Sequence, residues 1–132
     1  KHASDGTIVL SFQNGTATGL QAEKPNYSKT ESATVPDYDA NPDATPLNGI
    51  SNVATPTSTP LQGFEIADDS GKWVSATATI KGDQIVLSAA DGSSNCNAVT
   101  QVRYWWSGNP VISSLLYNDL GLPASPFIAV VE

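Results

Sequence analysis

The chain has 132 residues, of which 39% are hydrophobic and 14% charged, and its net charge is −7. This length is enough for one domain with a real core, which we place at residues 1–132. The six basic residues are scattered singly, which argues against a nucleic-acid partner, and no apolar run approaches the roughly 18 residues of a membrane-spanning helix.

Alternation of apolar and polar side chains predicts strands along much of the chain. The first is "TIVLSFQ" (7–13), which alternates cleanly and is typical of a half-buried strand. "WVSATATIK" and "QIVLSAA" flank the dipeptide Gly82-Asp83, a two-residue loop that favours a hairpin. Further strands are expected at 61–68, 98–107 and 127–131. Abundant Thr and Val, with 10 Gly and 9 Pro, also favour β structure. The predicted class is therefore all-β, an antiparallel β-sandwich of jelly-roll type.

Residues 21–60 differ from the rest of the chain in composition and in hydrophobic pattern. They hold six of the nine prolines and show no sustained period, which predicts a long Pro/Thr/Asn/Asp-rich insertion with at most one or two short strands. Oxygen-bearing side chains recur there at every second residue, as in calcium loops: Asp37, Asp39, Asn41 and Asp43. Pro42 stands where an EF-hand requires Gly, so a solvated acidic loop is the alternative. Calcium is the one cofactor that the sequence suggests.

Catalytic machinery is not evident in the sequence. The only histidine is His2, close to a terminus, where disorder is the default expectation. No G-x-S-x-G, P-loop or H-E-x-x-H motif occurs. The glutamates are scattered, and the lone Cys96 excludes an intrachain disulfide. We therefore expect the chain by itself not to be an enzyme.

The stretch "TQVRYWWSGNP" raises the clearest functional question, because it holds three aromatic residues in a row. Neighbours in a strand point to opposite faces, so Tyr104 and Trp106 are expected in the core and Trp105 on the other face beside Arg103. Three interpretations stay open for Trp105: packing under the insertion, stacking on a sugar, or contact with another domain. Arg103 is expected to pair with an Asp of the insertion or to lie on the Trp105 ring.

An ordered series of phrases follows in the C-terminal half: "GFEI", "KGD", "VRYWWSGNP" and "LYNDLGLPASPF". In this order they resemble the C-terminal β-domain of the sialate O-acetylesterase-like carbohydrate esterases, and "TIVLSFQNGTATGLQA" resembles the opening strand of that domain. The matching residues are Gly63, Phe64, Ile66, Lys81, Gly82, Asp83, Val102, Arg103, Tyr104, Trp106, Asn109, Pro110, Leu116, Tyr117, Asn118 and the run 121–127. Tyr117 and Asn118 are expected to fix the corner in this ending. The resemblance covers all but the 21–60 insertion.

The resemblance implies an accessory domain. In these esterases the hydrolytic Ser, Asp and His lie in a separate SGNH-hydrolase domain with Gly-Asp-Ser and Asp-x-x-His motifs, and neither motif occurs here. The family's strand usually has Ala where this chain has Trp105, and the long insertion is a second departure. The chain starts without Met or a signal segment, which suggests a module excised from a larger enzyme; the resemblance places that enzyme outside the cell or on its surface.

These observations predict a non-catalytic accessory module that binds a neutral plant-type polysaccharide such as xylan, xyloglucan or glucomannan. The acidity of the chain disfavours polyuronates unless calcium bridges them. The alternative is a scaffold domain of a carbohydrate esterase with no ligand of its own. The expected partners are the polysaccharide and an attached catalytic domain. The predicted ligand-binding residues are Trp105, Arg103, Tyr38, Tyr27, Asn109 and Trp73.

Overall fold

The computed structural model describes residues 1–13, 15–24, 54–90, 96–106 and 113–132. These residues form nine strands: β1 (Ile8–Ser11), β2 (Gln21–Lys24), β3 (Thr55–Pro56), β4 (Phe64–Asp68), β5 (Trp73–Lys81), β6 (Gln84–Ala89), β7 (Val99–Tyr104), β8 (Leu115–Tyr117) and β9 (Phe127–Val130). All pairings between them are antiparallel, so the predicted all-β antiparallel class is confirmed. None of the residues described belongs to a helix of the length and hydropathy that crossing a membrane requires.

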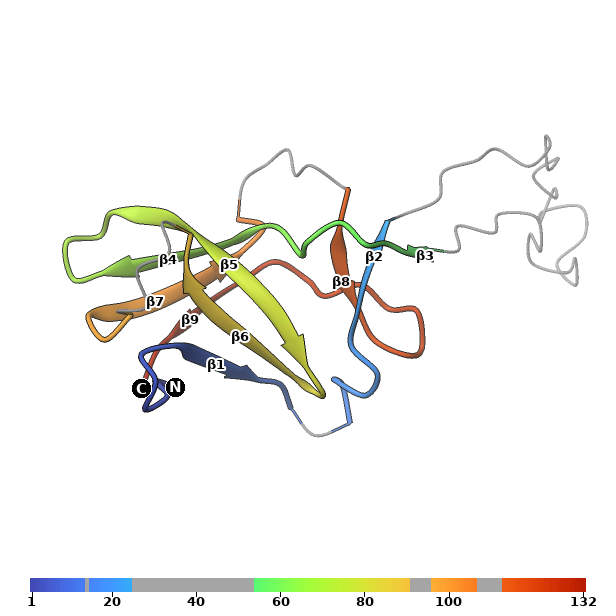
Figure 1. Ribbon diagram of the computed structural model, residues 1–132, viewed down its shortest axis with the longest axis horizontal. Helices are drawn as coiled ribbons and strands as arrows, with labels where there is room; N and C mark the ends of the chain where they lie inside the picture. The colour runs from blue at the N-terminus through green and yellow to red at the C-terminus, as the bar shows by residue number, and fades with distance from the viewer. Residues whose placement is uncertain (14, 25–53, 91–95, 107–112) are drawn as a thin grey trace, which may run out of the picture.

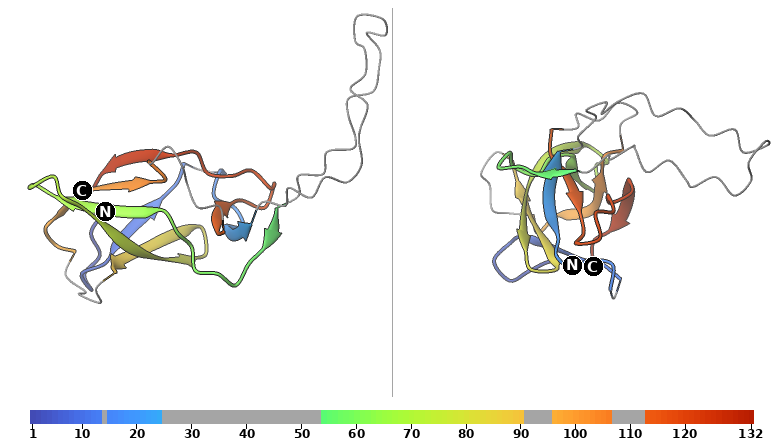
Figure 2. Two further views of the ribbon diagram at one scale, coloured as in Figure 1. Left: turned by 90° about the horizontal axis from the view of Figure 1, so that it is seen from above. Right: turned by 90° about the vertical axis from the view of Figure 1, so that its right-hand side faces the viewer.

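The strands form two sheets of unequal size. The larger has the order β1-β6-β5-β4-β7-β9 and the smaller the order β3-β2-β8. The larger sheet curls because the long strand β5 changes partner: its first residues pair with β4, and from Ala76 onward it pairs with β6. The smaller sheet lies at one end of the curled sheet (Figures 1 and 2).

The local signals in the sequence account for several of these strands. β1 lies within the predicted strand 7–13, and its first residue, Ile8, is fully buried. Lys81 pairs with Gln84 across the predicted hairpin, so Gly82-Asp83 forms the loop. Gly82 has a φ of 63°, a conformation that a glycine adopts without steric cost. β2 and β3 lie at the two ends of the predicted insertion and pair with each other.

Tyr104, the last residue of β7, joins the two sheets through the core. Its ring stacks on Phe127 at 5.7 Å and tilts against Phe64 at 4.6 Å, and it is 1% exposed. Its hydroxyl oxygen accepts a hydrogen bond of 2.9 Å from the backbone N–H of Leu116 in β8. The core cluster around it consists of Ile8, Leu61, Phe64, Ile66, Ala78, Ile85, Leu87, Cys96, Val99, Val102 and Leu116.

Tyr104→Phe is expected to lower the free energy of unfolding by about 1–3 kcal/mol, because it leaves the N–H of the buried Leu116 without its acceptor. Chemical denaturation at neutral pH measures this loss. Unchanged stability would mean that the hydroxyl does not join the sheets.

The same residue gives the stability a pH dependence at the alkaline end. Burial raises the pKa of Tyr104 above its ordinary value of 10.0, while the bond from Leu116 and the nearby Trp105 act in the opposite direction. Because the folded-state pKa is the higher one, Tyr104 stabilises the fold fully below pH 10.0 and loses this contribution as the pH rises toward the folded-state pKa. The stability difference between wild type and Tyr104→Phe is therefore expected to narrow above pH 10.0.

The first and last residues of the chain lie side by side (Figures 1 and 2). The backbone N–H of His2 donates to the carbonyl of Glu132 at 2.9 Å, and the N–H of Val9 donates to the carbonyl of Lys1 at 2.9 Å. His2 also forms a β-bridge with Ile8. The expectation that His2 is disordered is therefore wrong, because its backbone links edge strand β1 to the residues after β9.

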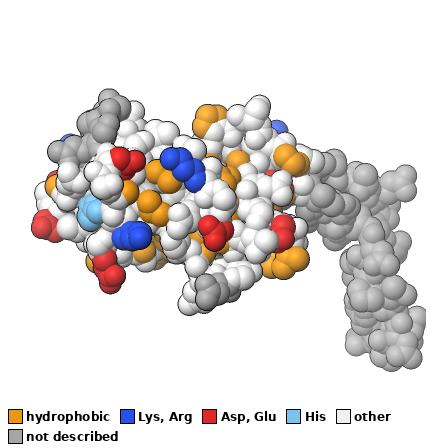
Figure 3. Space-filling view, turned by 60° about the horizontal axis from the view of Figure 1, so that its bottom comes forward, with side chains coloured by type: hydrophobic (Ala, Val, Ile, Leu, Met, Phe, Trp, Pro, Cys, Tyr) orange, Lys and Arg blue, Asp and Glu red, His pale blue; other side chains and the backbone are white. Residues whose placement is uncertain are grey.

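On the face shown in Figure 3, acidic and basic side chains are interspersed among hydrophobic ones.

Candidate functional site

A hollow of about 470 Å³ lies where β4 begins, between β5 and the residues that follow β7. It is lined by residues 60–65, by residues 75–77, and by Trp105 and Trp106. We call it the tryptophan hollow. It brings together the residue that the sequence singled out, Trp105, and polar side chains from β4 and β5.

The position of Trp105 depends on two unusual backbone conformations. Strand β7 ends at Tyr104, and Trp105 has a φ of 41°, the only positive φ among the non-glycine residues described. The N–H of Trp105 donates to the carbonyl of Gly63 at 2.8 Å, and Gly63 itself has a φ of 87°. A Cβ on Gly63 would lie 2.3 Å from Cε2 of the indole. The left-handed turn therefore lays the ring of Trp105 directly against a glycine that has no side chain to obstruct it.

This turn reverses the expectation for the two tryptophans. Trp106 is 55% exposed, so its predicted place in the core is wrong. Trp105 is half-buried and packs against the core cluster, with its ring edge-on to Tyr104 at 6.3 Å. The reason is that strand alternation holds only while the backbone is extended, and it stops at Trp105. The indole nitrogen of Trp105 is buried and has no acceptor among the residues described, so packing holds the ring.

Among the described residues, Arg103 contacts the side chains of Glu65 in β4 and Trp73 in β5, and not the ring of Trp105. The Asp residues of the insertion that were expected to pair with it lie outside the described part of the chain. The Nε of Arg103 donates to Glu65 Oε2 at 2.7 Å and its Nη2 to Glu65 Oε1 at 3.1 Å. Its guanidinium carbon lies 4.3 Å from the centre of the Trp73 ring. The side chains of Arg103 and Glu65 are 22% and 32% exposed. This bidentate ion pair fixes the carboxylate of Glu65. Glu65 is one of the residues that line the tryptophan hollow.

The remaining polar groups of the hollow come from three side chains. The Gln62 Oε1 atom accepts a hydrogen bond of 3.2 Å from Ser113 Oγ. Ser75 and Thr77 are exposed at alternate positions of β5. An exposed indole beside hydroxyl, amide and carboxylate groups suits a ligand with an apolar face and several hydroxyls.

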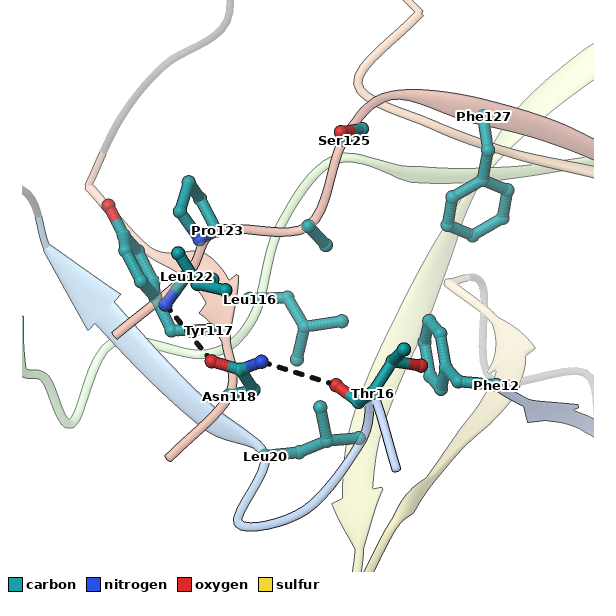
Figure 4. Close-up of a pocket in the computed structure, with 11 residues that line it drawn as sticks. Phe12, Thr16, Leu20, Leu116, Tyr117, Asn118, Leu122, Pro123, Ser125 and Phe127 are labelled. Carbon is teal, nitrogen blue, oxygen red and sulfur yellow. Dashed lines mark hydrogen bonds between the residues drawn. The ribbon is translucent and has the colours of Figure 1, made fainter. Parts of the chain in front are cut away.

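A second hollow, of about 310 Å³, lies at the corner before β9 and contains no charged side chain (Figure 4). We call it the corner hollow. Asn118 holds its rim: the side-chain oxygen accepts from the N–H groups of Leu120 and Leu122, and the nitrogen donates to the carbonyl of Thr16 at 3.3 Å. The expectation that Asn118 fixes this corner is confirmed. Leu120 and Leu122 are 74% and 58% exposed.

Several predicted site residues fall outside the described part of the chain: Tyr27, Tyr38, Asn109, Asp37, Asp39, Asn41 and Asp43. Within the described ranges, no group of three or more His, Cys, Asp or Glu side chains gathers to hold a metal. Trp73 and Arg103 do not line the tryptophan hollow; they support Glu65 from outside it.

Sequence reasoning missed Gln62, Glu65, Ser75 and Thr77 as members of the hollow. Strand alternation in "GFEI" and "WVSATATIK" predicts that Glu65, Ser75 and Thr77 point away from the core. Only the strand register, which pairs Glu65 with Ser75 on one side and with Arg103 on the other, brings them together.

Comparison with solved structures gives an informative likeness. No protein-family model and no curated protein matches the chain. The structure is similar to part of a solved carbohydrate acetylesterase from Xanthomonas citri, with a TM-score of 0.55 and 27% sequence identity. The similarity covers 96% of this chain and 20% of that chain. The chain therefore spans about a fifth of the esterase, and the likeness supports a relationship to carbohydrate esterases.

Proposed function

We propose that this chain is a non-catalytic accessory domain of a secreted or cell-surface carbohydrate esterase, one that acts on acetylated glycans. We further propose that it binds a neutral plant-type polysaccharide in the tryptophan hollow. The likeness to part of an acetylesterase supports the accessory role. The phrases shared with the C-terminal β-domain of the sialate O-acetylesterase-like enzymes support that domain as its counterpart.

The observation that carries the binding proposal is the exposed ring of Trp106 at the edge of a hollow floored by Trp105. Trp106 is 55% exposed and lines the hollow next to Trp105, and exposed aromatic surface that adjoins a hollow is typical of a binding site. The C–H face of a pyranose matches a flat indole, and the polar side chains around it can bind the hydroxyls. The only arginine of the chain, Arg103, already pairs with Glu65, which favours an uncharged ligand over a polyuronate.

Affinity electrophoresis of the domain against soluble xylan, xyloglucan and glucomannan, with and without EDTA, tests the proposal. Retardation by one class of glycan is the expected result. Loss of that retardation in EDTA would show that binding needs a divalent metal ion, for which the acidic series 37–43 is the candidate site. No retardation by any glycan would overturn the binding proposal.

Trp106→Ala is expected to weaken binding about tenfold or more, the effect of truncating an aromatic hot spot. Stability should stay within about 0.5 kcal/mol of wild type, because Trp106 is already more than half exposed. Leu122→Ala is the matched control, since Leu122 is 58% exposed but lies at the corner hollow. Loss of binding in Leu122→Ala alone would move the ligand site to the corner.

The corner hollow favours a second candidate function, a scaffold that binds no glycan and packs on an attached catalytic domain. Its lining is uncharged, and two exposed leucines stand at its rim. Under this alternative, Leu120 and Leu122 would be covered by the attached domain. Alanine at both positions would then lower the stability of the whole enzyme and leave that of the isolated domain unchanged.

A further inference from the structure

We infer that the tryptophan hollow binds sugar residues with free hydroxyls and rejects O-acetylated ones. The inference rests on the proposed function and deepens it. In an accessory domain of a carbohydrate acetylesterase, such a hollow would bind the deacetylated glycan that the enzyme produces, and so keep the enzyme attached to that glycan. Stretches of glycan that still carry acetyl groups would remain free for the catalytic domain.

The first step of the argument is the chemical nature of Glu65. An ionised carboxylate accepts hydrogen bonds and donates none. Each of its oxygens already accepts one bond from Arg103, and each keeps a further acceptor position. The side chain is 32% exposed and lines the hollow. Glu65 is therefore a fixed, negatively charged acceptor that a ligand can reach.

The second step concerns what can meet that acceptor. A sugar hydroxyl donates an O–H to a carboxylate, and hydrogen bonds of this charged kind are about twice as strong as neutral ones. An O-acetyl group has no hydrogen to donate, and its carbonyl oxygen is repelled by the carboxylate. A site whose polar group is placed to accept from a hydroxyl favours the free sugar over an analogue that lacks the O–H, because the acetylated sugar forms no hydrogen bond to the carboxylate.

The third step is that Glu65 is held in place. Arg103 lies between Glu65 and the ring of Trp73, so the carboxylate cannot swing away from an acetyl group without breaking its two hydrogen bonds to Arg103. Arg103 and Trp73 thus act as positioning residues: they touch no ligand, and they keep the charge of Glu65 at the edge of the hollow.

The experiment compares one polysaccharide in two forms. Acetylated glucomannan and acetylated xylan are each tested before and after mild alkaline deacetylation, so that backbone and chain length stay matched. We expect the wild-type domain to bind the deacetylated form about tenfold more tightly, the effect of one charge-assisted hydrogen bond. Glu65→Gln keeps the shape, removes the charge and supplies an N–H donor, so the preference is expected to shrink toward equal binding.

Asp68→Asn is the matched control, because it removes one negative charge from the end of β4 at a position that does not line the hollow. It should keep the wild-type preference. Thermal unfolding checks that Glu65→Gln is folded, and if that variant fails to fold, the wild-type comparison of the two glycan forms still tests the inference.

The two possible failures are distinguishable. Equal or tighter binding of the acetylated form, abolished in Trp106→Ala, would overturn this inference and leave the proposed function standing. Full preference retained in folded Glu65→Gln would overturn the role of Glu65. No binding of either form would remove the proposed function itself.

Discussion

Gly63→Ala is expected to lower the free energy of unfolding by about 2–5 kcal/mol, the sum of backbone strain and overpacking. Gly63 has a φ of 87°, where an L side chain is strained. The new methyl would also lie 2.3 Å from Cε2 and 2.4 Å from Cδ2 and Nε1 of Trp105. The indole must therefore move, and ligand binding in the tryptophan hollow is expected to fall together with stability. Urea denaturation measures the loss.

Gly71→Ala separates the two causes. Gly71 has a φ of 74° in the turn between β4 and β5, and a Cβ there would meet nothing within 4 Å. This variant should lose only the backbone term, about 1–2 kcal/mol. Equal losses in Gly63→Ala and Gly71→Ala would show that the contact between Gly63 and Trp105 contributes no packing constraint.

Trp105→Ala is expected to cost about 2–4 kcal/mol, somewhat less than a fully buried tryptophan because the ring is half-buried. The ring packs on Gly63 and on the core cluster, and its removal leaves both uncovered. Trp106→Ala is the comparison, since it should lose binding with little loss of stability. A Trp105→Ala domain that keeps full stability would contradict the packed position of the ring.

Trp105→Gly sharpens this test through the backbone. Glycine in place of alanine normally destabilises an ordered segment by roughly 0.5–1 kcal/mol. At a φ of 41° the left-handed conformation favours glycine, so Trp105→Gly should be no less stable than Trp105→Ala. A clear additional loss in Trp105→Gly would argue against the left-handed turn.

The elements that sequence reasoning predicted well are those set by local pattern. Alternation predicted β1 and the inward place of Tyr104, and the dipeptide Gly82-Asp83 predicted the β5–β6 hairpin. Asn118 was expected at a fixed corner, and its hydrogen bonds to Leu120 and Leu122 form one. The strand, the place of Tyr104 and the hairpin depend on residues close together in the sequence, where spacing decides the geometry. The expectation for Asn118 came from the resemblance to the esterase domain.

The candidate site was predicted only in part, because it depends on contacts distant in sequence. The left-handed turn at Trp105 has no sequence signal of its own, since that conformation is normally left to glycine. Its cause lies at Gly63, whose missing side chain makes room for the ring. Glu65 escaped notice for the same reason: its pairing with Arg103 follows from the register of β4 and β7.

Because the first and last residues lie side by side, the strands could be connected in a different order along the chain and still pack in the same arrangement. His2 and Glu132 already share a backbone hydrogen bond, so a short linker from Glu132 to Lys1 would close the chain into a ring without moving β1 or β9. That ring could be reopened at the exposed Gly82-Asp83 loop, which leaves every strand pairing intact. The domain is thus suited to circular permutation. A permuted chain that begins at Asp83 and ends at Gly82 should still form the tryptophan hollow.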